Sequence, residues 1–221
     1  MTFPYSRRLG VAMALVALAA AGCKSTTYLV PSPIIRDYDS RLPVTVGFLF
    51  TNDVRALWYH TQDGRMRIDV PIGQVAMDFA RASFQNAVDK FYIERYLDRR
   101  SQRGILIDVR GVRFDLTAMT AACTLDVAIL DAAGKEVLAQ AYTGTASPQD
   151  VDPTILNTYD GEAELEPATA QAFHNAYQSL LADVRSLLSA QLAAASAPAP
   201  EPAPAPAEAA PAPEAAPAPA P

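Results

Sequence analysis

The sequence is poor in the residues that build most active sites. It contains two histidines, two cysteines and one tryptophan among 221 residues. A zinc site needs three or four ligands at a recognisable spacing, and neither H-x-x-x-H nor C-x-x-C occurs. Glycine-rich phosphate loops and the G-x-S-x-G and S-x-x-K motifs of serine hydrolases are also missing. We therefore expect no metal, no cofactor and no enzymatic activity.

Positive charge is scarce as well. The chain has 18 Lys and Arg against 24 Asp and Glu, a net charge of −6. Residues 1–22 contain Arg7 and Arg8 and no acid, so a chain that starts at residue 23 has 16 against 24, or −8. Non-specific binding to nucleic acid needs a basic surface. The sequence therefore predicts no nucleic-acid partner.

The apolar run near the N-terminus is too short to span a membrane stably. The uncharged stretch from Gly10 to Gly22 would make a helix of about 20 Å, whereas a bilayer core needs about 20 residues. Arg7 and Arg8 precede it and small residues end it, which is the pattern of a secretory signal. A core helix with a chance cysteine and a signal without lipidation are the alternatives.

The residues Ala20-Ala21-Gly22-Cys23 resemble the lipobox of bacterial lipoproteins, with Ala20 in place of the usual leucine. The resemblance implies that residues 1–22 are a signal peptide and that Cys23 becomes the lipidated first residue, carrying diacylglycerol and palmitate. Lys24 is not the aspartate that retains lipoproteins of enteric-type bacteria at the inner membrane. The implied location is the periplasmic face of the outer membrane, with the membrane bound through the N-terminal lipid.

Composition divides the rest of the chain into three parts. Residues 23–43 contain Ser, Thr and Pro without a period, which predicts a tether that Tyr28-Leu29-Val30 or Ile34-Ile35 pins to the domain. Residues 44–193 carry the patterned segments of a folded domain. Residues 194–221 are rich in Ala and Pro and hold no larger aliphatic or aromatic residue, so this tail cannot bury enough surface to fold.

Alternation predicts strands at residues 44–51 and 105–116 and two hairpins. The first hairpin turns at Asp63-Gly64 and the second at residues 131–135. Within 105–116 the apolar positions change parity, which predicts a β-bulge at Arg110-Gly111. Cys123 alternates with apolar residues and is expected to be a small buried side chain rather than a reactive thiol. The facing sets expected in the second hairpin are Cys123, Leu125, Val127 and Ile129 against Val137, Ala139 and Ala141.

Two amphipathic helices are predicted, one from Pro71 to near Lys90 and one from Pro167 to near Leu192. Residues 91–97 fit a strand and a continued helix equally well. The order of elements predicts an α+β fold in which a mainly antiparallel sheet carries both amphipathic helices on one face.

Three stretches of this domain resemble a loose group of periplasmic lipoproteins. They are LPVTVGFLF, GQVAMDFARASFQNAV, and CTLDVAILDAAGKEV followed by the last helix, and together they span residues 40–192. The group includes the YajG-like lipoproteins, the auxiliary lipoproteins of ABC-type lipid transport systems and the activators of penicillin-binding proteins. The resemblance implies a role in binding or assembly and offers no catalytic residue to transfer.

The stretch ALWYH contains the only tryptophan of the chain. Core packing is the ordinary role of such a residue, and an exposed Trp58-Tyr59 pair at a recognition edge is the functional alternative. Arg65 and Arg67 on the adjoining arm of the hairpin suit a carboxylate or a phosphate. These four residues are the candidate binding site.

The expected function is that of a lipid-anchored periplasmic scaffold that binds an envelope protein complex. An accessory subunit of ABC-type lipid transport is one alternative, and it predicts an apolar groove between helices and sheet. A cell-wall hydrolase is the other, and it predicts a polar cleft with convergent carboxylates of perturbed pKa. His60 and His174 are expected at the surface or its boundary, and Asp160, Glu162, Glu164 and Glu166 in a solvated acidic loop.

Overall fold

The computed structural model describes residues 25–33, 35–63, 66–94, 104–156 and 165–196, without the side chains of residues 63, 66 and 191–196. Several predicted features lie outside the described residues. They are the signal peptide 1–22, Cys23, Ile34, Arg65, the acidic residues Asp160, Glu162 and Glu164, and the tail from residue 197 onward.

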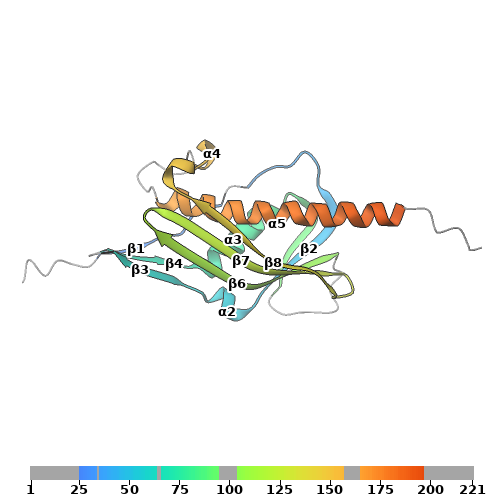
Figure 1. The fold of residues 1–221 in the computed structure, drawn as a ribbon, viewed down its shortest axis with the longest axis horizontal. Coiled ribbons are helices and arrows are strands. Elements are labelled where there is room, and N and C mark those ends of the chain that lie inside the picture. The colour runs from blue at the N-terminus through green and yellow to red at the C-terminus, as the bar shows by residue number, and fades with distance from the viewer. Residues whose placement is uncertain (1–24, 34, 64–65, 95–103, 157–164, 197–221) are drawn as a thin grey trace, which may run out of the picture.

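A five-stranded sheet forms the centre of the domain (Figure 1). Its order is β5–β2–β6–β7–β8, with β2 parallel to both β5 and β6 and the remaining pairs antiparallel. The bounds are β2 (Leu42–Phe50), β5 (Val88–Glu94), β6 (Ile105–Thr117), β7 (Thr120–Asp131) and β8 (Glu136–Ala146). The predicted α+β class is confirmed. The sheet is mixed rather than mainly antiparallel, because β5 and β6 both pair with β2 in parallel.

A second, three-stranded sheet has the order β1–β4–β3. It consists of β1 (Ser25–Tyr28), β3 (Tyr59–Asp63) and β4 (Met66–Val70). The first predicted hairpin is therefore present as β3 and β4, and β1 adds to β4 in parallel. The N–H of Leu29 donates to the carbonyl oxygen of Asp69 at 3.0 Å, and the Leu29 side chain is buried. The expected tether thus starts as a strand held on the domain.

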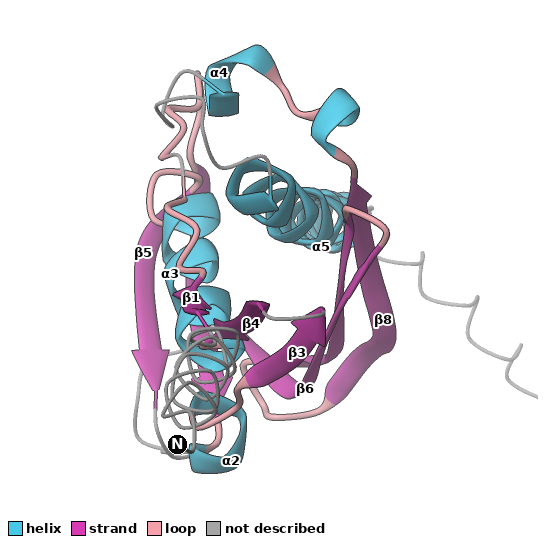
Figure 2. Ribbon diagram, turned by 90° about the vertical axis from the view of Figure 1, so that its left-hand side faces the viewer, coloured by secondary structure: helices cyan, strands magenta, loops and turns pink. Residues whose placement is uncertain are grey.

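Two long helices cover one face of the five-stranded sheet, as predicted (Figure 2). They are α3 (Ile72–Phe84) and α5 (Leu165–Ser196), and they contact each other as well as the sheet. Phe48 of β2 joins all three elements, since its ring centroid lies 4.9 Å from that of Phe84 and 6.3 Å from that of Tyr177. Among the described helices, none combines the length and the hydropathy that crossing a membrane requires.

Three short helical segments complete the described chain: α2 (Asn52–Arg55), η1 (Pro148–Asp150) and α4 (Pro153–Leu156). The sequence pattern gave no indication of α2, whose Thr51 side chain accepts a hydrogen bond from the N–H of Val54 at 3.4 Å. A four-residue helix is too short for its periodicity to be visible.

The first long helix is shorter than predicted. It ends at Phe84, and the N–H of Ala87 donates to the Phe84 carbonyl oxygen in the turn before β5. Phe91 lies on β5 opposite Val46 of β2, so residues 91–94 are strand, and residues 95–97 lie outside the described part. The four-residue spacing of Ala87 and Phe91 fits a helix locally. Pairing with β2 instead makes the segment from Val88 to Glu94 a strand.

The predicted bulge in β6 is confirmed. The register with β7 shifts between Val109 and Gly111, so that Val109 lies opposite Val127 and Val112 lies opposite Leu125. One extra residue reverses the parity of the strand and keeps both ends of β6 facing the core.

The expected facing set on β8 is wrong. Leu125 lies opposite Tyr142 and Ile129 opposite Leu138, whereas Val137 and its alternates are exposed. The reason is the approach of α5: a Cβ added at Gly144 would lie 2.1 Å from the carbonyl oxygen of Ala172. The even-numbered side of β8 therefore faces α5, since only glycine fits at this contact.

Candidate binding surface

The outer face of the small sheet carries an exposed aromatic and charged surface. Its residues are Tyr28 of β1, Trp58 immediately before β3, His60 of β3, and Arg67 and Asp69 of β4, and we call these five residues the Trp58 face. The registers place Tyr28, Asp69 and His60 side by side across the three strands. On the opposite side of the same strands, Leu29, Ile68 and Val70 are buried in the core.

Trp58 is exposed rather than part of the core. It retains 49% of its accessible surface, and Tyr28 retains 67%. The Trp58 and His60 rings stack with centroids 6.1 Å apart and planes 5° apart. The tryptophan is therefore presented to solvent by a fixed neighbour, so little side-chain freedom remains for a ligand to remove.

Asp69 organises the charged half of this face. Its Oδ1 lies 2.7 Å from Arg67 Nε and 2.7 Å from His60 Nδ1. Because an ionised carboxylate only accepts, Nδ1 of His60 carries the proton of that bond. The hydrogen bond from Arg67 holds the pKa of Asp69 below its usual range, and the bond from His60 acts in the same direction against desolvation.

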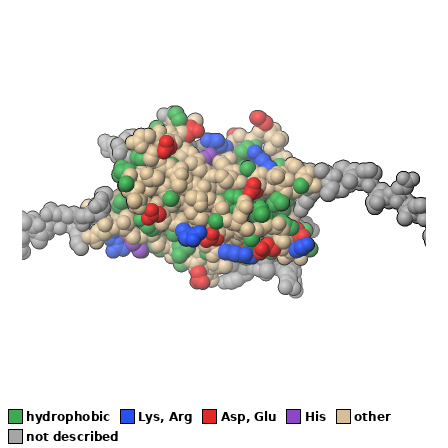
Figure 3. All heavy atoms as spheres, viewed as in Figure 1, with side chains coloured by type: hydrophobic (Ala, Val, Ile, Leu, Met, Phe, Trp, Pro, Cys, Tyr) green, Lys and Arg blue, Asp and Glu red, His purple; other side chains and the backbone are tan. Residues whose placement is uncertain are grey.

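The two partners of Asp69 remain accessible. The side chains of Arg67 and His60 are about half exposed, at 50% and 51%, whereas that of Asp69 is at 7%. Figure 3 shows Lys or Arg atoms and His atoms together at the lower left, over the small sheet. The buried Asp69 carboxylate therefore orients the side chains of Arg67 and His60, which remain accessible to a ligand.

The predicted site is only partly assembled. Trp58 and Arg67 lie on the face, and Arg65 lies outside the described residues. Tyr59 points the other way, because its hydroxyl accepts the N–H of Leu116 at 3.2 Å and its ring meets Phe114 edge-on at 5.0 Å. The expected exposed Trp58-Tyr59 pair is therefore not formed, since neighbours in a strand face opposite sides.

Sequence reasoning missed three members of the face, namely Tyr28, His60 and Asp69. His60 shares the parity of Trp58, so alternation alone would have placed it beside the tryptophan. Tyr28 had no such signal, because β1 is defined by its pairing with a strand that lies about 40 residues further along the chain.

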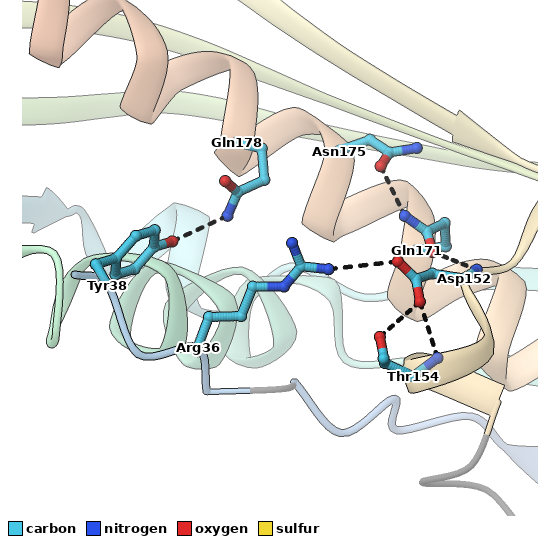
Figure 4. Close-up of polar contacts among 7 residues, drawn as sticks. All are labelled: Arg36, Tyr38, Asp152, Thr154, Gln171, Asn175 and Gln178. Carbon is cyan, nitrogen blue, oxygen red and sulfur yellow. Dashed lines mark hydrogen bonds and ion pairs between the residues drawn. The ribbon is translucent and has the colours of Figure 1, made fainter.

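The segment between β1 and β2 is fastened across both long helices (Figure 4). The Tyr38 hydroxyl donates to the Ser83 carbonyl oxygen of α3 at 3.3 Å and accepts from Gln178 Nε2 of α5 at 3.3 Å. An amino nitrogen of Arg36 forms an ion pair with Asp152 Oδ2 at 3.5 Å, beside α4. These contacts hold the region that the sequence suggested as a tether against the body of the domain.

A polar cluster around Asp152 supports this segment from the α5 side (Figure 4). Asp152 Oδ1 accepts from the N–H and the hydroxyl of Thr154 at 2.8 and 2.6 Å, and these bonds lower its pKa. The N–H of Asp152 donates to Gln171 Oε1 at 3.0 Å. Asp152 therefore has structural partners for both its backbone N–H and its side-chain carboxylate.

His174 lies beside this cluster and is buried, with 7% of its surface exposed. Burial lowers its pKa to about 4, with a further lowering from the charge of Arg36 that Asp152 partly offsets. The imidazole is consequently neutral near pH 7. This agrees with a boundary residue of the fold and not with a charged surface histidine.

The space between the helices and the large sheet, where an acyl groove was expected for lipid transport, is filled with rings. Phe48, Phe84, Phe173 and Tyr177 are each fully buried there. Two open hollows, of about 450 and 330 Å³, instead lie along α3 and β5 and share Arg81 and Ile93. Their linings are mostly polar.

The cell-wall hydrolase alternative finds no catalytic centre among the described residues. Among the described carboxyl groups, the pKa of Glu166 is raised by burial, whereas the pKa values of Asp69, Asp150 and Asp152 are lowered by hydrogen bonds. No three His, Cys, Asp or Glu side chains in this part gather as metal ligands. Cys123 is buried, as predicted, and burial raises the pKa of its thiol.

Comparisons with known proteins give no family. No family model and no curated protein matches the chain. A crystal structure of protein XCC0632 from Xanthomonas campestris, described with the family model DUF330, is 14% identical, with a TM-score of 0.49 over 77% of this chain and 99% of that one. The hypothetical protein CT253 from Chlamydia trachomatis is 7% identical, with a TM-score of 0.43 over 66% and 99% of the two chains. At these scores, no conclusion about this chain rests on either likeness.

Proposed function

We propose that this chain is a lipid-anchored scaffold on the periplasmic face of a bacterial outer membrane, attached through Cys23 and bound to an envelope protein complex. One observation carries the proposal. Strand β1 begins at Ser25, two residues after Cys23, at one end of the long axis, and α5 ends at Ser196 at the other (Figure 1). A rigid body that separates an anchor from a distant helix end is suited to hold a partner at a fixed distance from the membrane.

The distal half of α5 is the surface best suited to the protein partner. Beyond Val184, which is fully buried, Leu187 and Leu188 are only half-buried. The helix projects past the edge of the sheet in Figure 1. Apolar side chains on one face of a projecting helix are a common docking element for a second helix or a groove.

The two alternatives receive less support. Buried aromatic rings occupy the region where lipid transport predicts an apolar groove. The described carboxylates with lowered pKa are engaged by Arg67, Ser147 and Thr154, whereas a hydrolase needs a pair of unequal pKa facing one cleft.

Anchoring is tested by Cys23→Ser in the native host, followed by cell fractionation and mass measurement of the N-terminus. We expect the wild-type protein in the outer membrane with an acylated residue 23, and the variant unprocessed or released. A variant that is cut at the same site and remains in the membrane would show that the lipoprotein assignment is wrong.

Scaffolding is tested by in-cell crosslinking from a photoreactive residue at Ser186, which is exposed on α5. The same residue placed at Ser25, at the opposite end of the described fold, is the matched control. We expect one envelope protein to be captured from Ser186 and not from Ser25. Capture of lipid alone from Ser186 would favour the transport alternative.

A further inference from the structure

We propose that the Trp58 face lies against the phosphate headgroups of the membrane that anchors the chain, so that the small sheet fixes the orientation of the domain. This inference rests on the proposed lipidation of Cys23. It adds a second, non-covalent contact with the membrane and names the ligand of the face. The protein partner then binds elsewhere on the domain.

The first support is the length of chain available. Two residue steps separate Cys23 from Ser25, and five separate it from Tyr28. A fully extended chain covers at most about 3.6 Å per residue, so Tyr28 lies within about 18 Å of the anchored cysteine. Because Leu29 is buried and bonded to β4, no later slack increases this distance. The small sheet must therefore remain next to the membrane surface.

The second support is the chemistry of the face. Trp and Tyr side chains are enriched at membrane interfaces because one end is apolar and the other accepts or donates hydrogen bonds. Trp58 and Tyr28 are the aromatic residues exposed here. Arg67 uses Nε for Asp69, and one of its amino nitrogens lies 3.4 Å from His60 Nδ1. The other amino N–H groups of its half-exposed guanidinium can donate to a phosphate oxygen.

The third support is the rigid connection between the small sheet and the body. Tyr59 accepts from Leu116 of β6 and packs on Phe114, and the N–H of Gly73 in α3 donates to the Leu57 carbonyl oxygen at 3.1 Å. A membrane contact at the Trp58 face therefore sets the direction of the large sheet and α5 as well. A flexible tether would leave that direction free.

The single tryptophan makes the experiment direct. The full-length lipidated protein is reconstituted into vesicles of phosphatidylethanolamine and phosphatidylglycerol, with and without bromine on the upper acyl carbons. We expect brominated lipid to lower Trp58 emission about twofold or more, as for an interfacial tryptophan. Arg67→Gln should weaken this quenching, and Arg113→Gln should not, because Arg113 is an exposed arginine paired with Asp126 on the large sheet.

A moved reporter provides the positional control. In a Trp58→Phe background, Val137→Trp places the only tryptophan on an exposed site of β8. Val137 lies near the β7–β8 turn, whereas the small sheet contacts β6 near Leu116, at the opposite end of the β6–β7 pair. We expect no quenching at residue 137.

Two failures are distinguishable. If the acylated protein floats with the vesicles but Trp58 is quenched no more than the reporter at residue 137, the face does not touch the membrane and this inference is wrong while the anchor stands. If residue 23 carries no lipid and the protein does not float, the anchoring proposal fails and removes this inference with it.

Discussion

The Tyr177 hydroxyl of α5 donates a hydrogen bond to the carbonyl oxygen of Ala76 in α3, at 2.7 Å. Both residues are fully buried. The bond joins the two helices directly beneath the aromatic rings of the core, where no water competes for either atom. It is a contact between segments that lie about 100 residues apart, and it fixes how α3 and α5 sit on the sheet.

Tyr177→Phe is expected to lower the free energy of unfolding by about 1 kcal/mol, because it removes one buried hydrogen bond and keeps the ring. Urea denaturation followed by circular dichroism measures the difference. Tyr28→Phe is the matched control, since Tyr28 is exposed, and it should change nothing measurable. An equal effect of the two substitutions would show that the Tyr177 bond does not contribute.

Gly144→Ala should destabilise the protein strongly. The new Cβ would lie 2.1 Å from the Ala172 carbonyl oxygen and 2.5 Å from the Ala176 nitrogen, and both are backbone atoms of α5. Separating helix and sheet to relieve such a clash costs about 3 kcal/mol or more. Thermal unfolding would show it as a large fall in Tm or as a loss of soluble protein.

Gly111→Ala is the control for this substitution. Its Cβ would lie 3.3 Å from a carboxylate oxygen of Asp126, which is a side chain that can move. We expect nearly unchanged stability. If Gly144→Ala were tolerated as well as Gly111→Ala, the close packing of α5 on β8 would be contradicted.

The lowered pKa of His174 predicts that the protein loses stability on mild acidification. Its pKa is lowered from 6.5 in the unfolded chain to about 4 in the fold, so the unfolded state binds more protons between these values. Stability therefore falls as the pH drops through this window, by about 2 kcal/mol at about pH 5 relative to neutral pH. Denaturant unfolding at the two pH values measures the change.

His174→Gln should remove most of this pH dependence, whatever it does to stability at neutral pH. His60→Gln, which replaces the other histidine, should retain it. Carboxylates with lowered pKa, such as Asp152, lose their contribution only at lower pH, so they do not obscure the comparison. An unchanged slope in His174→Gln would contradict the assignment.

The β6–β7 turn offers a stabilising substitution. Ala118 and Met119 have φ values of 49° and 68°, a left-handed conformation that costs non-glycine residues about 1 kcal/mol each. The double substitution Ala118→Asn and Met119→Gly should raise the free energy of unfolding by about 1 kcal/mol. Thermal melting would reveal a higher Tm, and a lower Tm would mean that the Met119 side chain makes a contact that outweighs the strain.

The parts of the fold that follow from local chemistry were predictable. The bulge at Arg110-Gly111 was visible because only one extra residue explains a change of parity within a continuous strand. Both amphipathic helices were visible through apolar residues spaced three and four apart, which form a stripe along one side of each helix. In each case the pattern lies within one continuous segment of the chain.

The parts that depend on distant partners were not predictable in this way. The sequence of β8 has apolar residues on both sides of the strand. The close packing of α5 against Gly144 determines that the even-numbered side faces the core. Pairing with β2 ends α3 and makes β5 a strand. For Trp58 the sequence left a core position and an exposed edge open, and the structure shows it exposed. Tyr28 lies on the same face only through the pairing of β1 with β4.

The parallel pairing of β2 also affects the order in which the chain can fold. Val46 lies between Phe91 and Ile105, so β2 is synthesised before both of its neighbours and has none in the large sheet until β5 has emerged. The hairpins of β6, β7 and β8 close over short loops and can form early. An apolar strand must meanwhile stay unpaired, and such a segment is prone to aggregate. We therefore expect slow folding, and a need for a holding chaperone during any crossing of a membrane in the unfolded state.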